Sequence, residues 1–174
     1  MNKSQLLQMW DLMRQRHGIG LRCIEALPAD KLDSHAIPNM RTPKELVVHM
    51  YDLVIRAMAE GVLRGKITAD ESAEKRIAAK IKNRDELLKF ARDCWDAADT
   101  AVSQITDHQL AGSVGTPWNF NAPGTFMFGI THDEYLHHRG QLYAYLRALG
   151  VEPPMMWDFE HNAPEYQPKA HAHA

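Results

Sequence analysis

Apolar residues recur at helical spacing along most of this chain of 174 residues, and this periodicity limits the folds open to it. Four long segments carry such a pattern, and loops rich in Pro, Gly and Asn separate them. No run of Val, Ile and Thr alternates as a half-buried strand would. The sequence therefore predicts an all-α chain.

The first two helical segments have clear boundaries. One is expected over about residues 3–27, and a proline ends it because proline cannot donate the next helical hydrogen bond. The other begins after Thr42, which can cap the helix, with Pro43 at the first helical position and Glu45 completing a capping box. We expect this second helix to extend to about residue 61.

Two further helical segments follow a charged stretch. That stretch, residues 64–83, reads RGKITADESAEKRIAAKIKN, and part of it can also be helical. Asn83 and Glu86 form the capping box that opens the third helix. The fourth is expected over about residues 125–150, because Gly150 suits the position after a helix and two prolines follow it.

The loop before the last helix, GSVGTPWNFNAPG at residues 112–124, shows no periodicity and is longer than a bundle connection requires. Long loops that carry aromatic residues often form the wall of a pocket, and Trp118 and Phe120 are candidates for that role. A plain surface crossing, with the two rings capping one end of the helices, is the alternative.

Length and composition narrow the class of protein. A chain of this length supports a single domain, predicted over residues 1–168, with a His/Ala tail at residues 169–174 that we interpret as a frayed or added terminus. The net charge of -2 provides no broad cationic surface, so nucleic acid is not an expected partner. No window approaches the run of about 20 apolar residues that spans a bilayer, and the N-terminus lacks the apolar stretch of a signal peptide. We therefore expect a cytoplasmic protein with no membrane partner.

The two cysteines, Cys23 and Cys94, each lie inside a helical pattern. In a reducing compartment such residues are small buried hydrophobes rather than a disulfide pair. A nucleophilic role for either thiol is the less favoured interpretation.

Residues 131–142, THDEYLHHRGQL, gather three histidines, an aspartate and a glutamate within a few positions. Successive residues of an α-helix are rotated by about 100°, so Glu134 and His138 lie one turn apart on one face. His137 lies on the solvent side of that face, and His132 lies on the opposite side of the helix. Two donors on one helix are compatible with a metal site and also with an exposed Glu/His pair that binds nothing.

His49 shifts the balance toward a metal site. It lies among the apolar residues of the second helix, where a buried histidine without a partner would cost about 1 to 3 kcal/mol. A hydrogen bond within the core is one explanation. The sharper explanation is that His49 is a third metal ligand, which a neighbouring helix places beside Glu134 and His138.

The neighbours of this set on the last helix have predicted roles of their own. Arg139 faces the far side of the helix, where we expect a structural salt bridge rather than a contact with substrate. Gln141 and Tyr145 follow the face of the candidate ligands, where they can orient water or substrate, although Tyr145 is equally credible as ordinary packing.

Two segments carry a resemblance to a known family. HHRGQLYAYLRALGVEPP, together with the earlier TPKELVVHMYDL, resembles the DinB/YfiT-like superfamily of small bacterial four-helix metal-binding proteins. By position, the resemblance implies that His49 and His138 are the second-helix ligand and the last ligand. The middle ligand of the family is usually histidine, whereas this chain has Glu134, and two histidines with one carboxylate are also a known catalytic zinc set.

The resemblance implies an up-down four-helix bundle that holds one divalent metal ion, such as zinc, nickel, manganese or iron, at His49, Glu134 and His138. The carboxylate shifts the preference toward harder ions. The implied function is a metal-dependent enzyme, a thiol S-transferase or a hydrolase, that acts as a homodimer on a small molecule such as a low-molecular-weight thiol. The alternative is a non-catalytic metal-binding or stress-response protein.

Overall fold

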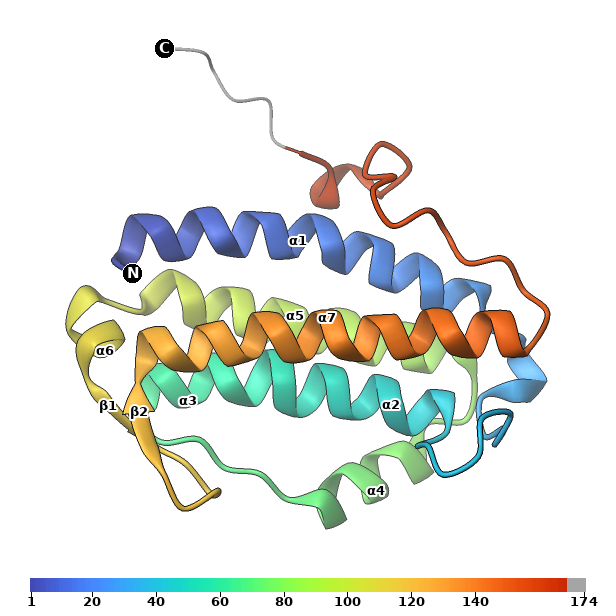
Figure 1. Cartoon of the computed structure of the whole chain (residues 1–174), viewed down its shortest axis with the longest axis horizontal. Helices are drawn as coiled ribbons and strands as arrows, with labels where there is room; N and C mark the ends of the chain where they lie inside the picture. The colour runs from blue at the N-terminus through green and yellow to red at the C-terminus, as the bar shows by residue number, and fades with distance from the viewer. Residues whose placement is uncertain (169–174) are drawn as a thin grey trace.

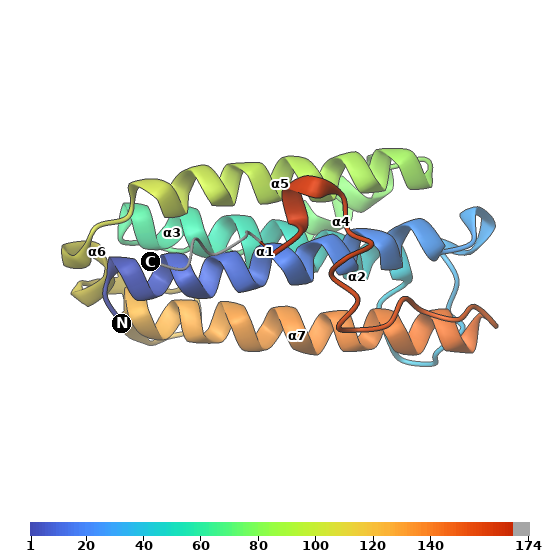
Figure 2. The same cartoon turned by 90° about the horizontal axis from the view of Figure 1, so that it is seen from above.

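Four long helical elements lie side by side in the computed structural model, which describes residues 1–168 (Figure 1). They are α1 (Lys3–Ala26), a second element made of α2 (Pro43–His49), the π-helical segment η2 (Met50–Ala57) and α3 (Met58–Arg64), then α5 (Arg84–Gln104) and α7 (Gly124–Ala148). Seen from above, these elements still share one long axis (Figure 2). The prediction of an all-α four-helix bundle is confirmed.

The helix ends follow the capping residues of the sequence. The Thr42 side chain accepts a hydrogen bond from the N–H of Glu45, and the Glu45 carboxylate accepts one from the N–H of Thr42 at 2.9 Å. Asn83 caps α5, although the carboxylate of Glu86 turns to a neighbouring N–H instead of closing the expected box. Gly150 follows α7 with a left-handed φ of 75°, a conformation that glycine adopts without strain.

The two middle elements of the bundle run in the same direction, because α4 (Glu71–Lys80) carries the chain back along the outside (Figure 1). As a result, α5 starts at the end of the bundle where α2 starts. There Lys44 Nζ donates to the carbonyl oxygen of Ile81 at 3.3 Å, and Arg84 donates to that of Leu27 at 3.1 Å. Part of the charged stretch is therefore helical, as the sequence allowed.

The loop before α7 contains ordered structure that the sequence pattern did not show. It holds the short helix α6 (Asp107–Ala111) and an antiparallel hairpin of β1 (Ser113–Gly115) and β2 (Asn121–Pro123). Strands of three residues are too short to reveal themselves by alternation. The hairpin carries Trp118 and Phe120 between its strands, so the two rings are held at one place.

The core that α1, the second element and α5 share is rich in aromatic residues. His17 is fully buried there, with its ring stacked on Trp95 at 4.5 Å between centroids and its Nδ1 2.9 Å from the Tyr51 hydroxyl. Cys23 and Cys94 are buried as expected, and burial raises the pKa of each thiol to about 12. Neither thiol is therefore a thiolate near neutral pH.

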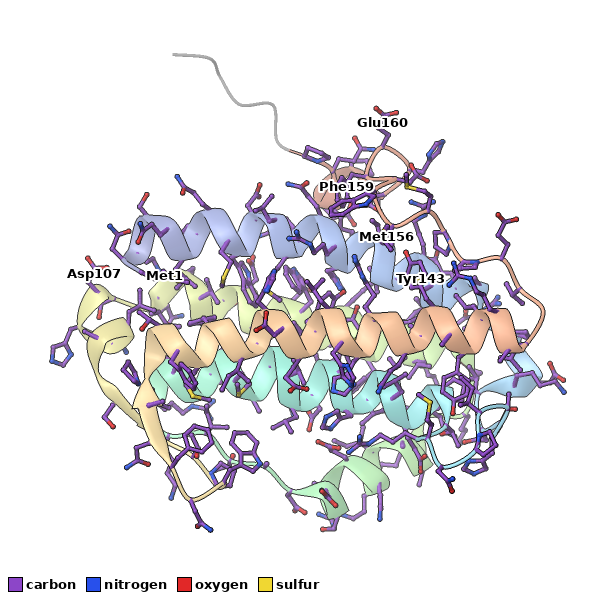
Figure 3. The ribbon with its side chains drawn as sticks, in the orientation of Figure 1. Met1, Asp107, Tyr143, Met156, Phe159 and Glu160 are labelled. Carbon is purple, nitrogen blue, oxygen red and sulfur yellow. The ribbon has the colours of Figure 1, made fainter. Side chains whose placement is uncertain are left out.

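The chain after α7 returns along α1, on the side of the bundle away from α4 (Figure 1). Arg22 of α1 forms an ion pair with Asp158 at 2.7 Å, and the buried Asn162 side chain donates to the Gln15 carbonyl oxygen at 2.9 Å. Figure 3 labels Glu160 within this segment. These contacts fix the returning segment against the first helix.

Within residues 1–168, no helix combines the length and the apolar character needed to cross a membrane. The His/Ala tail at residues 169–174 lies outside the described residues, and the domain boundary at residue 168 stays a prediction.

Candidate metal centre

The structure brings the three predicted ligands to one place between α2 and α7. His49 is the last residue of α2, and its ring is perpendicular to that of His138, with 4.8 Å between the centroids. Glu134 Oε2 lies 3.3 Å from His138 Nε2. His49 and Glu134 also line the same pocket. The helical geometry assumed from the sequence is therefore correct, and the role of the three residues as ligands stays a prediction.

His138 presents a buried nitrogen that lacks a hydrogen bond. The residue is only 5% exposed, and its Nδ1 lies 2.9 Å from the amide oxygen of Gln141, whose own nitrogen lies 2.9 Å from His137 Nε2. With the amide in this orientation, His138 carries its proton on Nδ1 and keeps a lone pair on Nε2. That Nε2 is within ion-pair distance of Glu134, yet no group within residues 1–168 is aligned to hydrogen-bond to it. Burial lowers the pKa of His138, so the neutral, ligand-competent form is favoured.

His49 is oriented by a carboxylate that the sequence did not reveal. Its Nδ1 lies 3.0 and 3.2 Å from the two carboxylate oxygens of Glu74, a residue of α4 that is only 8% exposed. A carboxylate acceptor at Nδ1 fixes the proton there and leaves Nε2 unprotonated, with a lone pair that can bind a metal ion. This is the usual arrangement around metal-binding histidines. In the sequence, Glu74 belongs to a charged stretch that looks solvated, and only the contact of α4 with α2 shows its role.

The helix changes its hydrogen-bond pattern directly after His49, where the π-helical segment η2 begins. A π-turn has more residues per turn than an α-turn, so it changes which side chains face inward. Tyr51, two residues on, reaches the core and contacts His17, whereas His49 faces α4 and α7. π-Helical turns occur frequently at functional sites, and no feature of the sequence predicted this one.

A pocket of about 350 Å³ opens beside His49 and Glu134. Its walls combine the aromatic pair of the hairpin with apolar residues of the second element and α7 and with glutamates of α4. The Trp118 and Phe120 rings are stacked at 6.3 Å between centroids with 24° between their planes. The structure therefore places both rings in the wall of a pocket, one of the two roles the sequence left open.

Arg139 corrects one expectation. It is 8% exposed and lies with its guanidinium carbon 6.0 Å from the centre of the Tyr143 ring, and its Nη1 has no hydrogen-bond partner within residues 1–168. The structure shows no salt bridge for it in that part of the chain, and its charged neighbour is another cation, Arg16. Tyr145 is fully buried and donates to the Arg41 carbonyl oxygen, which supports ordinary packing. His132 pairs with its neighbour Asp133, on the opposite side of the helix from the candidate ligands, as expected.

The donor atoms of these side chains are of the types that bind divalent ions, but their present positions do not form a metal-binding arrangement. No three His, Cys, Asp or Glu side chains of residues 1–168 stand in a metal-binding arrangement. A buried Nε2 without a hydrogen bond, a carboxylate beside it and a second, oriented imidazole nevertheless form a suitable donor set. Among the three candidate ligands, the Glu134 side chain is the most exposed, at 49%.

Comparison with known proteins gives one family and two related structures. The model of the DinB family matches residues 1–169. A DinB-like protein of Bacillus subtilis, YjoA, has a TM-score of 0.65 and 17% identity, covering 82% of this chain and 92% of its own. YfiT of Bacillus subtilis, described as a probable metal-dependent hydrolase with an unusual four-helix bundle topology, has a TM-score of 0.65 and 16% identity, covering 87% and 91%. Identities this low show the shared fold alone, and no curated protein matches the sequence.

The family match spans nearly the whole chain, and both related structures share its helical arrangement over more than four-fifths of its length. The histidine of TPKELVVHMYDL and the HHRGQ segment, which carried the resemblance in the sequence, meet in space at the rings of His49 and His138. The chain belongs to the DinB family.

Proposed function

We propose that this chain is a metal-dependent enzyme of the hydrolase or thiol S-transferase type, with a divalent ion held by His49, Glu134 and His138. The observation that carries the proposal is the buried Nε2 of His138, which has no hydrogen bond and lies beside a carboxylate and a second imidazole. An ion bound by such a set lowers the pKa of a coordinated water or thiol and so supplies a nucleophile near neutral pH.

The surrounding residues support a catalytic site over a closed structural one. Three protein ligands leave coordination positions for water or substrate. Glu74 and Gln141 hold the two rings with Nε2 available, and the pocket beside His49 offers space for the organic part of a substrate. A purely structural ion needs no such pocket.

The two reaction types have different support. The description of YfiT as a probable metal-dependent hydrolase favours hydrolysis. The thiol S-transferase, with a low-molecular-weight thiol and a homodimer, is favoured by the family resemblance of the sequence. Light scattering at micromolar concentration tests the dimer, and a monomer would remove it from the proposal.

The test begins with metal uptake in a chain whose tail cannot bind metal. A His171→Ala/His173→Ala background is expected to hold about one divalent ion per chain, measured by elemental analysis after dialysis. His138→Ala should lose that ion, whereas His132→Ala, on the opposite side of α7, should keep it. A background chain that takes up no ion would refute the site.

Turnover then separates the classes of function. The metal-loaded chain is assayed against esters and amides and against pairs of a thiol and an electrophile. Turnover that depends on the ion and is lost in His138→Ala supports an enzyme. Uptake without turnover supports the non-catalytic alternative.

A further inference from the structure

We infer that the pocket beside the candidate metal centre takes an apolar organic group that carries a positive charge or no charge, and that it disfavours carboxylates. This inference rests on the proposed function, because it names the class of substrate for the same site. Three observations carry it: the charge of the pocket wall, its aromatic pair, and one glutamate without a partner.

The charged groups in the wall are all acidic. Glu71, Glu74 and Glu134 line the pocket, and no Lys or Arg of residues 1–168 does. A divalent ion brings two positive charges against three carboxylates, so the pocket remains negative after the ion binds. Arg41 and Lys75 line a separate hollow of about 100 Å³ that shares Glu71 and Glu74 with this pocket. Away from the candidate metal centre, a ligand carboxylate in the larger pocket would therefore meet like charges without a Lys or Arg of residues 1–168 in the wall to pair with.

The remaining wall is apolar and suits one ring or a short chain. Leu53, Met58 and Ile130 line the pocket together with the stacked rings of Trp118 and Phe120. The two aromatic residues are 43% and 40% exposed, an unusual exposure for side chains of this size. A volume of about 350 Å³ is at the lower end for small-molecule pockets, and aromatic faces also attract organic cations.

Glu71 is the carboxylate available to a ligand. Glu74 contacts His49, and Glu134 contacts His138, so both are engaged at the candidate metal centre. The Glu71 side chain has no ion pair or hydrogen bond with any residue of 1–168. An ammonium group near Glu71, with its apolar body against Trp118, therefore pairs with a carboxylate that no described residue engages and covers an exposed ring.

The test compares two probes that share a phenylethyl group and carry opposite charges, 2-phenylethylamine and 3-phenylpropanoate. Binding to the full chain is followed by NMR through the line broadening of the probe's own aromatic resonances, with and without the metal ion. We expect the amine to bind about tenfold more tightly than the acid, because the wall offers the amine a carboxylate and offers the acid no Lys or Arg of residues 1–168. Equal affinities, a preference for the acid, or no binding of either probe would overturn the inference.

Matched variants separate the pocket from the overall charge. Glu71→Gln should reduce the preference for the amine about threefold, whereas Glu160→Gln, the same change on the opposite side of the bundle, should leave it unchanged (Figure 3). Trp118→Ala should weaken both probes, and Phe126→Ala, which removes another exposed ring outside the pocket, should not. Equal effects of Glu71→Gln and Glu160→Gln would show that net charge, not this pocket, sets the preference.

These measurements read binding and not turnover, so the two proposals fail separately. A chain that binds metal and turns over substrate while preferring the acid overturns the substrate class and leaves the proposed function in place. A chain that prefers the amine and binds no metal overturns the proposed function and leaves the pocket assignment in place.

Discussion

His17 and His138 are both buried, and their ring nitrogens have the same pattern of hydrogen bonds. Each Nδ1 lies 2.9 Å from a side-chain oxygen, of Tyr51 or of Gln141, and each Nε2 is buried without a hydrogen-bond partner within residues 1–168. A buried nitrogen without a partner therefore does not by itself identify a metal ligand in this chain.

The surroundings of His17 exclude a cation. Trp95 stacks on the ring, and Tyr166 meets it edge-on at 4.8 Å between centroids. Burial lowers the pKa of His17 well below its usual value, and the positive charges of Arg14 and Arg92 lower it further. No carboxylate of residues 1–168 is hydrogen-bonded or ion-paired to this ring, so a metal ion there would lack the anionic partner that Glu134 offers at His138.

The surroundings of His138 are those of a ligand. Glu134 lies 3.3 Å away, the ring of His49 lies at 4.8 Å, and Glu74 lies behind His49. The difference between the two histidines is thus the presence of carboxylates and of a second imidazole, and each experiment below probes that difference.

The largest expected effect is the loss of metal binding in His138→Ala. Affinity should fall by more than about 100-fold, because loss of an outer-shell partner alone already costs about 10- to 100-fold. Isothermal titration calorimetry in the His171→Ala/His173→Ala background measures it. The counterpart His17→Phe should keep the ion. If His17→Phe lost the ion and His138→Ala kept it, the proposed site would be at the wrong histidine.

Glu134→Gln should weaken metal binding by about 10- to 100-fold and leave the circular dichroism spectrum unchanged, because a neutral amide oxygen is a poorer donor than a carboxylate. Glu134→His restores the more usual ligand of the family and should keep the ion. A Glu134→Gln variant with unchanged affinity would remove this residue from the ligand set.

Glu74→Gln should weaken metal binding about tenfold, because the amide holds the His49 ring less firmly and no longer fixes its proton on Nδ1. In the metal-free chain, nitrogen NMR of the His49 ring should show a smaller preference for the proton on Nδ1. The matched control is Glu71→Gln on the same helix, which has no contact with His49. If both variants bind metal equally well, Glu74 has no role in orienting the ligand.

The last effect concerns folding and not metal binding, and it is a pH dependence of the free energy of unfolding to which His17 contributes. Folding keeps this ring neutral, whereas the unfolded chain takes up a proton at about pH 6.5. The buried ring therefore costs no stability above that pH, where both states are neutral, and it lowers the stability as the pH falls below it, by up to about 1.4 kcal/mol per pH unit. Urea unfolding between pH 7.5 and 5 measures the slope, and His17→Phe should reduce it. An unchanged slope would mean that other groups govern acid sensitivity.

The sequence predicted the parts of the fold that depend on local chemistry. The cap at Thr42, the glycine after α7 and the shared face of Glu134 and His138 all follow from residues within one or two helical turns of each other. His49 was identified for a related reason, since a polar residue among apolar ones requires an explanation.

The missed features depend on which helices become neighbours. Glu74 lies in a stretch whose composition predicts exposure, and only the docking of α4 against α2 buries it. The parallel course of the two middle elements follows from that same helix. Periodicity shows which side of a helix faces inward, but it does not show what lies opposite.

The contact between α4 and His49 also couples the binding of a ligand at His49 to the docking of α4 on the bundle. A ligand that binds better when His49 is held by Glu74 must, by thermodynamic reciprocity, make α4 harder to detach from the bundle. Because α4 also forms part of the pocket wall, the amide hydrogens of residues 71–80 would exchange more slowly as the ion binds. The exchange rates of the α4 amides would then measure the fraction of chains that have bound the ion.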